Sequence, residues 1–95
     1  MFDHSFKVLE KTMKETAGEQ ATLAHNLANI NNPNYKAMEF DKELGKAIER
    51  LDKKKLTLEE EMAALSENSL KYSGLVKLMT GKMGILKTIA SQGRR

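Results

Sequence analysis

The fold of this 95-residue chain is decided by the stretch Leu23-Ala24-His25-Asn26-Leu27-Ala28-Asn29-Ile30-Asn31-Asn32-Pro33-Asn34-Tyr35-Lys36. Its first half has the pattern of a helix, because Leu23, Leu27 and Ile30 recur at steps of four and three. Its second half ends that helix, since the residue before a proline avoids the helical region and Pro33 has no N–H to donate. Residues 31–37 are predicted to turn the chain outward. Asn34 is expected at a positive φ and Tyr35 as the anchor of the turn.

Residues 1–30 before the turn carry a heptad pattern over four repeats. Polar Thr16 and Gln20 fill the two weak places of this pattern. We predict one helix from about Asp3 to Ile30. The heptad positions are Phe2, Phe6, Leu9, Met13, Thr16, Gln20, Leu23, Leu27 and Ile30.

Residues 57–95 are predicted to form a second long helix. Thr57-Leu58-Glu59-Glu60 has the form of a capping box, in which a threonine hydroxyl accepts a backbone N–H three residues on. The heptad stripe beyond it consists of Leu58, Met62, Leu65, Ser69, Tyr72, Val76, Met79, Met83, Leu86 and Ala90. A second apolar stripe follows, interrupted by Lys82, at Leu75, Leu78, Ile85 and Ile89. The two stripes make a face wider than one partner helix covers.

Three glycines, Gly74, Gly81 and Gly84, weaken this helix where it is most apolar. We therefore expect it to become ordered by packing against other subunits.

Residues 38–56 are predicted to contain a short charged helix from about Glu39 to Asp52, followed by a solvated linker at residues 53–55. The apolar positions behind this prediction stand at steps of four, four and three: Phe40, Leu44, Ile48 and Leu51. The expected fold is therefore all-α and one structural unit. Its long terminal helices pack as a coiled-coil-like hairpin or bundle, antiparallel or parallel and staggered, with a shorter middle helix.

Composition argues against most chemical functions. The net charge of +3 is too small to indicate a nucleic-acid partner, and without cysteine there is no disulfide, thiolate metal site or cysteine nucleophile. Neither His4 nor His25 has a second ligand at metal spacing, and His25 is expected to make a polar contact. We expect no enzyme, cofactor or metal site. We also expect no membrane span and, from residues 1–6, no cleavable signal peptide.

Charge is unevenly distributed along the chain. After Glu67 every ionised side chain is basic, whereas residues 59–61 are all glutamate. We interpret this as the arrangement that a helix dipole favours. The bases after Glu67 are Lys71, Lys77, Lys82, Lys87, Arg94 and Arg95.

The sequence resembles the flagellar basal-body rod proteins. That family has an N-terminal motif of the form A-x-N-I-A-N-x-x-T-P-G-Y-K, and residues 24–36 follow it with Asn32 for threonine and Asn34 for glycine. Residues 65–72, 75–79 and 86–89 are similar to the C-terminal part of proximal rod subunits. The middle region is short for the family.

The resemblance implies a structural subunit that assembles through its terminal helices into a hollow axial tube and is partly disordered before assembly. It implies export through the flagellar type III apparatus without signal cleavage, and a place in the periplasmic rod. The implied partners are other rod subunits, further copies of the chain, and the membrane ring or adaptor at the rod base. Residues expected to pack in the assembly are Leu23, Leu27, Ile30, Pro33, Tyr35, Leu65, Tyr72, Val76, Met79, Met83 and Leu86.

Two alternatives come from the same sequence. A small helical adaptor or chaperone would bind an amphipathic partner helix, and it would form a cooperative monomer or dimer in solution. A basic nucleic-acid binder would need a charged patch that the sequence does not show.

Overall fold

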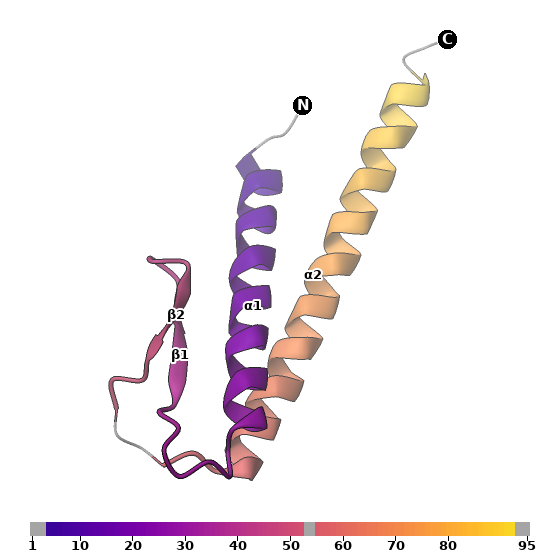
Figure 1. Cartoon of the computed structure of the whole chain (residues 1–95). Helices are drawn as coiled ribbons and strands as arrows, with labels where there is room; N and C mark the ends of the chain where they lie inside the picture. Colours follow the sequence, from indigo (N-terminus) through magenta and orange to yellow (C-terminus); the bar gives the residue numbers. More distant parts are fainter. Residues whose placement is uncertain (1–3, 53–54, 93–95) are drawn as a thin grey trace.

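A computed structural model describes residues 4–52 and 55–92 as two long helices with a small β-hairpin against one of them (Figure 1). The elements are α1 (His4–Ala28), β1 (Met38–Asp41), β2 (Lys46–Glu49) and α2 (Leu58–Gln92). The helices lie side by side and antiparallel, closest where α1 ends and α2 begins (Figure 1). They diverge toward the opposite end, so the molecule is elongated, with extents of 65 × 24 × 15 Å. The predicted heptad position Phe2 and the predicted helix start at Asp3 lie outside the described residues.

The predicted stop of the first helix is confirmed within two residues. α1 ends at Ala28, and the amides of Asn29 and Ile30 still reach carbonyls three residues back. A turn follows in which the Tyr35 N–H donates to the Asn32 carbonyl at 3.1 Å. The Asn32 side chain also accepts the N–H of Asn34 at 3.0 Å.

The predicted positive φ at Asn34 is wrong, since no non-glycine residue described by the structure has one. Asparagine at the first position of the turn and Pro33 at the second suit a type I turn, which needs negative φ throughout.

The predicted start of the second helix is confirmed. The hydroxyl of Thr57 accepts the N–H of Glu60 at 3.3 Å, and the Thr57 carbonyl accepts the N–H of Glu61 at 3.1 Å. Glu59, Glu60 and Glu61 occupy the first turn, where the helix dipole stabilises negative charge. The last turn described, however, holds no basic residue. Arg94 and Arg95 lie outside the described residues, so the helix dipole does not account for the lysines from Lys71 to Lys87.

The predicted middle helix is wrong, and the fold is therefore mainly helical rather than all-α. Residues 38–49 form an antiparallel hairpin in which Phe40 pairs with Ala47 and Asp41 with Lys46. Gly45 closes the turn at a φ of 68°, a conformation that glycine adopts without steric cost. The Asp41 carboxylate accepts the N–H of Leu44 at 2.9 Å. The helical spacing was coincidental, because the hairpin leaves Leu44 61% exposed. Of the predicted linker, Lys53 and Lys54 lie outside the described residues.

The hairpin docks on α1 through Phe40 and Gly18. A β-carbon at Gly18 would overlap the Phe40 ring, so the ring lies where a side chain of α1 would otherwise stand. Gly18 is a poor helix former in the middle of α1, but its missing side chain lets the hairpin approach the helix backbone closely.

The stripe of α2 that faces α1 differs from the predicted hydrophobic stripe, because every second position lies one residue earlier in the sequence. Leu65, Tyr72, Met79 and Leu86 are half-buried as the sequence pattern predicts. The positions between them on the interface are Glu61, Asn68, Leu75 and Lys82, each one residue before the predicted Met62, Ser69, Val76 and Met83. The predicted stripe has apolar residues at three of these four positions, whereas Glu61, Asn68 and Lys82 of the interface are polar or charged.

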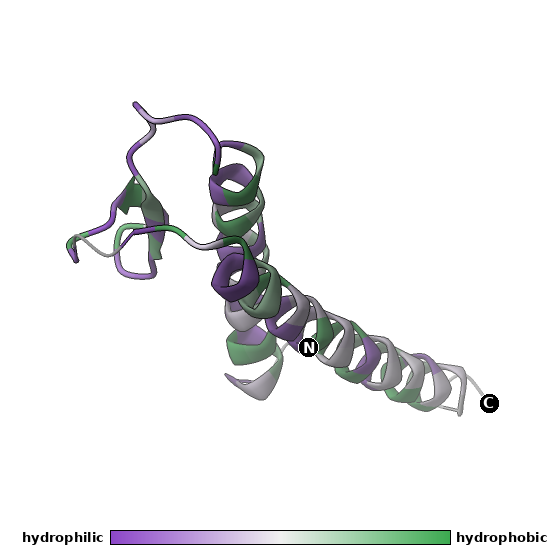
Figure 2. Cartoon of the chain, turned by 90° about the horizontal axis from the view of Figure 1, so that it is seen from below, coloured by the Kyte–Doolittle hydropathy of each residue, from purple (hydrophilic) through white to green (hydrophobic). Residues whose placement is uncertain are grey.

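Little apolar surface is buried within the part of the chain that the structure describes. Phe6 is the sole buried apolar residue there, and Figure 2 shows hydrophobic stretches recurring along α2. A β-carbon at Gly74, Gly81 or Gly84 would meet nothing within 4 Å. Much of the surface of α2 is therefore open. The exposed large apolar residues of α2 are Leu58, Met62, Leu70, Val76, Leu78, Met83, Ile85 and Ile89.

We predict that Gly18→Ala destabilises the chain by about 1–3 kcal/mol, as overpacking does, because the new methyl group displaces Phe40. The matched change Gly74→Ala stabilises it by about 1 kcal/mol, since alanine is the better helix former and the space is empty. Urea unfolding followed by circular dichroism measures both changes, and hydrogen exchange at residues 38–49 reports undocking. A stable Gly18→Ala chain with protected hairpin amides would contradict this role of Gly18.

Candidate functional site

Asn26 is the hub that joins the helices, the turn and the hairpin. It sits near the end of α1 and is fully buried. Its side-chain oxygen accepts the Met38 N–H at 2.9 Å, and its side-chain nitrogen donates to the Met38 carbonyl at 2.8 Å. The amide thus pairs with the start of β1 as a neighbouring strand would, which fixes where the hairpin leaves the turn.

Tyr35 brings the turn onto this hub. Its hydroxyl donates to the Asn26 side-chain oxygen at 2.6 Å and lies 2.8 Å from His25 Nδ1. Because the hydroxyl gives its one proton to Asn26, His25 Nδ1 acts as the donor to Tyr35. The predicted polar contact of His25 and the predicted anchoring by Tyr35 are both confirmed.

The start of α2 joins the same network through Glu61. Its carboxylate accepts from Asn26 Nδ2 at 3.4 Å and forms an ion pair with Arg50 at 3.1 Å. The side chains are 6% exposed for Glu61 and 18% for Arg50, so the pair is shielded from water. The Arg50 backbone N–H also donates to the Ala37 carbonyl at 2.8 Å, which continues the hairpin ladder.

A second polar layer lies midway along the helix pair. It includes Thr16 and Gln20, the two polar positions in the heptad pattern of α1. The Asn68 side-chain nitrogen donates to the Thr16 carbonyl at 2.9 Å and to Gln20 Oε1 at 2.8 Å. The Gln20 amide in turn donates to Ser69 Oγ at 3.3 Å. The buried Thr16 hydroxyl donates to the carbonyl of Thr12. The layer fixes the register of the two helices, because a shift along either would break these bonds.

Neither layer has the form of a catalytic or metal site. Among the residues that the structure describes, every buried side-chain nitrogen and oxygen has a hydrogen-bond partner. No group of three or more potential ligands in residues 4–52 and 55–92 is placed to hold a metal ion. In the same residues, no helix is long and apolar enough to cross a membrane. The polar network therefore holds the fold together.

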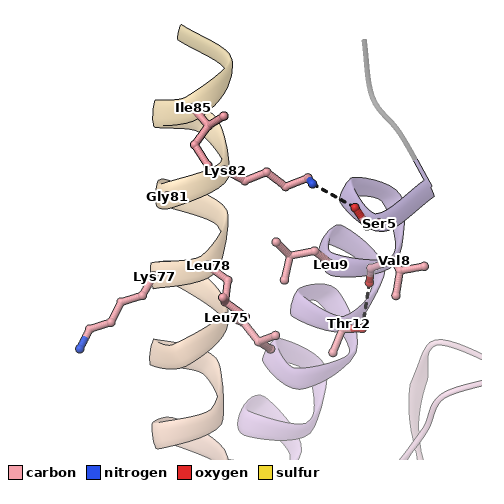
Figure 3. A pocket seen from close by; sticks show the side chains of 10 residues that line it. All are labelled: Ser5, Val8, Leu9, Thr12, Leu75, Lys77, Leu78, Gly81, Lys82 and Ile85. Atoms are coloured by element: carbon pink, nitrogen blue, oxygen red, sulfur yellow. Dashed lines mark hydrogen bonds between the residues drawn. The ribbon is translucent and has the colours of Figure 1, made fainter. Parts of the chain in front are cut away.

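The opposite end of the helix pair has an open apolar groove of about 630 Å³. Figure 3 shows Leu9 of α1 and Leu75 of α2 pointing toward one another between the diverging helices. Lys82 crosses the gap and donates to Ser5 Oγ at 3.0 Å, while Lys77 extends away from α1 (Figure 3). The lining residues are Ser5, Val8, Leu9, Thr12, Leu75, Lys77, Leu78, Gly81, Lys82 and Ile85.

The residues predicted to pack in an assembly fall into two sets. Half-buried within the chain are Leu23, Leu27, Ile30, Tyr35, Leu65, Tyr72, Met79 and Leu86. Pro33, Val76 and Met83 are exposed, the last two by 38% and 41%. The packing role of both sets stays a prediction.

Sequence reasoning missed Asn26, Glu61 and Asn68 as structural positions. The signal for two of them was present, because Glu61 and Asn68 are seven residues apart and continue to Leu75 and Lys82.

Comparison with known proteins gives one similarity. No family model matches the chain. Over 127 aligned positions it is 25% identical to the flagellar basal body rod protein FlgB of Bacillus subtilis (strain 168). The match covers 99% of this chain and 98% of that protein. Because this chain has 95 residues, the relative carries residues that this chain lacks.

We predict that Asn26→Ala strongly destabilises the chain, because both backbone groups of Met38 lose their partner and each unsatisfied buried group costs about 1–3 kcal/mol. The matched variant is Asn29→Ala, which removes one exposed bond to the His25 carbonyl and changes stability by about 0.5 kcal/mol or less. Thermal unfolding by circular dichroism compares them. Equal losses in the two variants would show that Asn26 is not the hub.

We predict that stability falls in strong base through Tyr35. Burial raises the pKa of its phenol above 10.0, the Glu61 carboxylate raises it further, and Arg50 opposes the rise. Since the folded pKa exceeds the unfolded one, this contribution is complete below about pH 10 and is lost as pH rises through the folded pKa. In a Tyr72→Phe chain the remaining tyrosine is Tyr35. Its ultraviolet titration should have a higher midpoint in the folded chain than in urea; an equal or lower midpoint refutes the prediction.

Proposed function

We propose that this chain is a structural subunit of the bacterial flagellar basal-body rod and catalyses no reaction. The observation that carries the proposal is the similarity, through nearly all of both chains, to a flagellar basal body rod protein. The architecture supports it, because a pair of long helices whose apolar residues remain partly exposed suits a subunit that completes its core on assembly.

The mechanism we propose is packing of neighbouring subunits on the exposed stripes of α2. Val76 and Met83 are seven residues apart on one face of the helix and are 38% and 41% exposed. Fully burying an exposed apolar side chain of this size is worth about 1.5–3 kcal/mol, and covering the part of each that is still exposed contributes a share of that, so several such contacts per subunit add up along a tube. The glycines of α2 leave room for another backbone to come close.

The proposal includes the setting that the rod implies. The subunit would leave the cytoplasm through the flagellar type III export apparatus without signal cleavage and join the periplasmic rod. Its partners would be other rod subunits, copies of itself, and the membrane ring or adaptor at the rod base. No step in this scheme needs a cofactor.

We predict that Val76→Asp abolishes rod assembly and motility when the variant gene replaces the unmodified gene in the source bacterium. The introduced carboxylate is buried without a partner when subunits pack, while in the isolated chain it stays in contact with water. Motility in soft agar and electron microscopy of purified basal bodies measure the effect. Helicity of the purified variant should match the unmodified chain.

The control is Ser73→Asp, which adds the same charge at an exposed polar position of the same helix. Wild-type motility with Val76→Asp would exclude this face from assembly. If a strain without the gene builds complete rods, the proposed function is refuted.

A further inference from the structure

The two ends of α2 carry opposite charge. Its first turns hold Glu59, Glu60, Glu61 and Glu67, whereas every ionised residue after them is a lysine: Lys71, Lys77, Lys82 and Lys87. The acidic end lies at the closed end of the helix pair, where α1 ends and α2 begins. The lysines run toward the open end, where the two helices diverge (Figure 1). Because the molecule is 65 Å long and α2 runs along it, the charges of α2 are separated along the longest axis.

Most of these charges have no partner within the described part of the chain. Glu61 pairs with Arg50, and Lys82 donates to Ser5. Glu59, Glu60, Lys71, Lys77 and Lys87 are exposed, and within residues 4–52 and 55–92 none of these five makes an ion pair. The helix dipole explains the glutamates of the first turn but not lysines several turns from the other end.

Each end also presents uncovered apolar side chains. At the closed end Leu58 and Met62 are 53% and 51% exposed and lie one turn apart on α2. At the open end Leu78 and Ile85 are both 63% exposed and line the groove with Val8 of α1. The two surfaces thus combine apolar contact area with unpaired charge of opposite sign.

We propose that the groove at the open end binds the start of α2 of a second copy of this chain, so that copies join head to tail. Leu58 and Met62 of one copy occupy the groove beside Leu78 of the next. Glu59 and Glu60 then lie on the lysine-bearing half of α2, whose Lys77 lines the groove while its side chain extends away from α1. The biological setting of this contact rests on the proposed function. The contact adds to that function the two surfaces that meet and the direction in which copies add.

Charge selects this arrangement over a twofold pairing of two open ends. Such a pairing would bring lysine-bearing halves of α2 together, and like charges in contact are repulsive. A head-to-tail contact uses two different surfaces, so each added copy presents a fresh one and the chain of copies does not close by itself. Exposed ion pairs are screened by salt, so association should weaken as ionic strength rises.

The test blocks one surface at a time in the full-length chain. Leu78→Asp blocks the groove, and Met62→Asp blocks the start of α2. Both side chains are more than half exposed, so neither change should unfold the subunit, which circular dichroism checks. The matched control is Leu70→Asp, at a leucine that is 74% exposed on α2 and does not line the groove. Sedimentation velocity over a range of concentrations gives the size distribution.

The unmodified chain and Leu70→Asp should form a concentration-dependent series of oligomers. Leu78→Asp and Met62→Asp should each be monomeric alone. Mixed in equal amounts they should form a discrete pair, because one keeps an intact α2 start and the other an intact groove. A mixture that remains monomeric, a blocked variant that still forms the series, or an unmodified chain that is monomeric at millimolar concentration overturns the proposal. Association that strengthens with salt overturns it too.

These outcomes are separate from those of the proposed function. A chain that is monomeric in solution but restores rods in the deletion strain refutes the head-to-tail contact and leaves the rod assignment standing. A chain that associates head to tail, in a strain that builds complete rods without it, refutes the rod assignment and leaves the contact standing.

Discussion

The structure depends on how one buried amide is satisfied. The side chain of Asn26 has two donor hydrogens and an oxygen with two lone pairs, and Met38, Tyr35 and Glu61 use all four. These three residues belong to the hairpin, the turn and α2, so one side chain of α1 sets the position of every other element. An apolar residue of similar size would fill the space but would leave the start of β1 without its partner.

The molecule separates two tasks that a small globular domain combines. Inside, the Asn26 hub and the layer formed by Asn68, Thr16 and Gln20 select one register of the helix pair, because hydrogen bonds are directional. Outside, apolar side chains remain exposed and supply contact area of low directional specificity. Order within the subunit thus comes largely from polar contacts, and attraction between subunits would come largely from apolar ones.

Local signals predicted the long elements well. Pro33 and the Thr57 cap act through the backbone within a few residues, so both helix boundaries could be inferred from sequence. The hairpin could not be inferred from sequence, because the spacing of Phe40, Leu44, Ile48 and Leu51 also fits a helix. The hairpin is favoured by the docking of Phe40 on Gly18, a residue more than 20 positions away. The stripe of α2 that faces α1 was assigned one residue off at every second position. Hydropathy favours Met62 over Glu61, whereas the fold buries the glutamate that Asn26 and Arg50 hold.

The hairpin turn from Lys42 to Gly45 has a consequence for how such chains vary in size. It is exposed and held by contacts within its own few residues, and a β-carbon at its closing Gly45 would meet nothing within 4 Å. Residues inserted there would extend from the side of the helix pair without entering the polar network, and a longer loop costs little additional closure entropy. Evolution could therefore enlarge the middle of the chain into a separate outer domain while the helices and their buried asparagines stay unchanged.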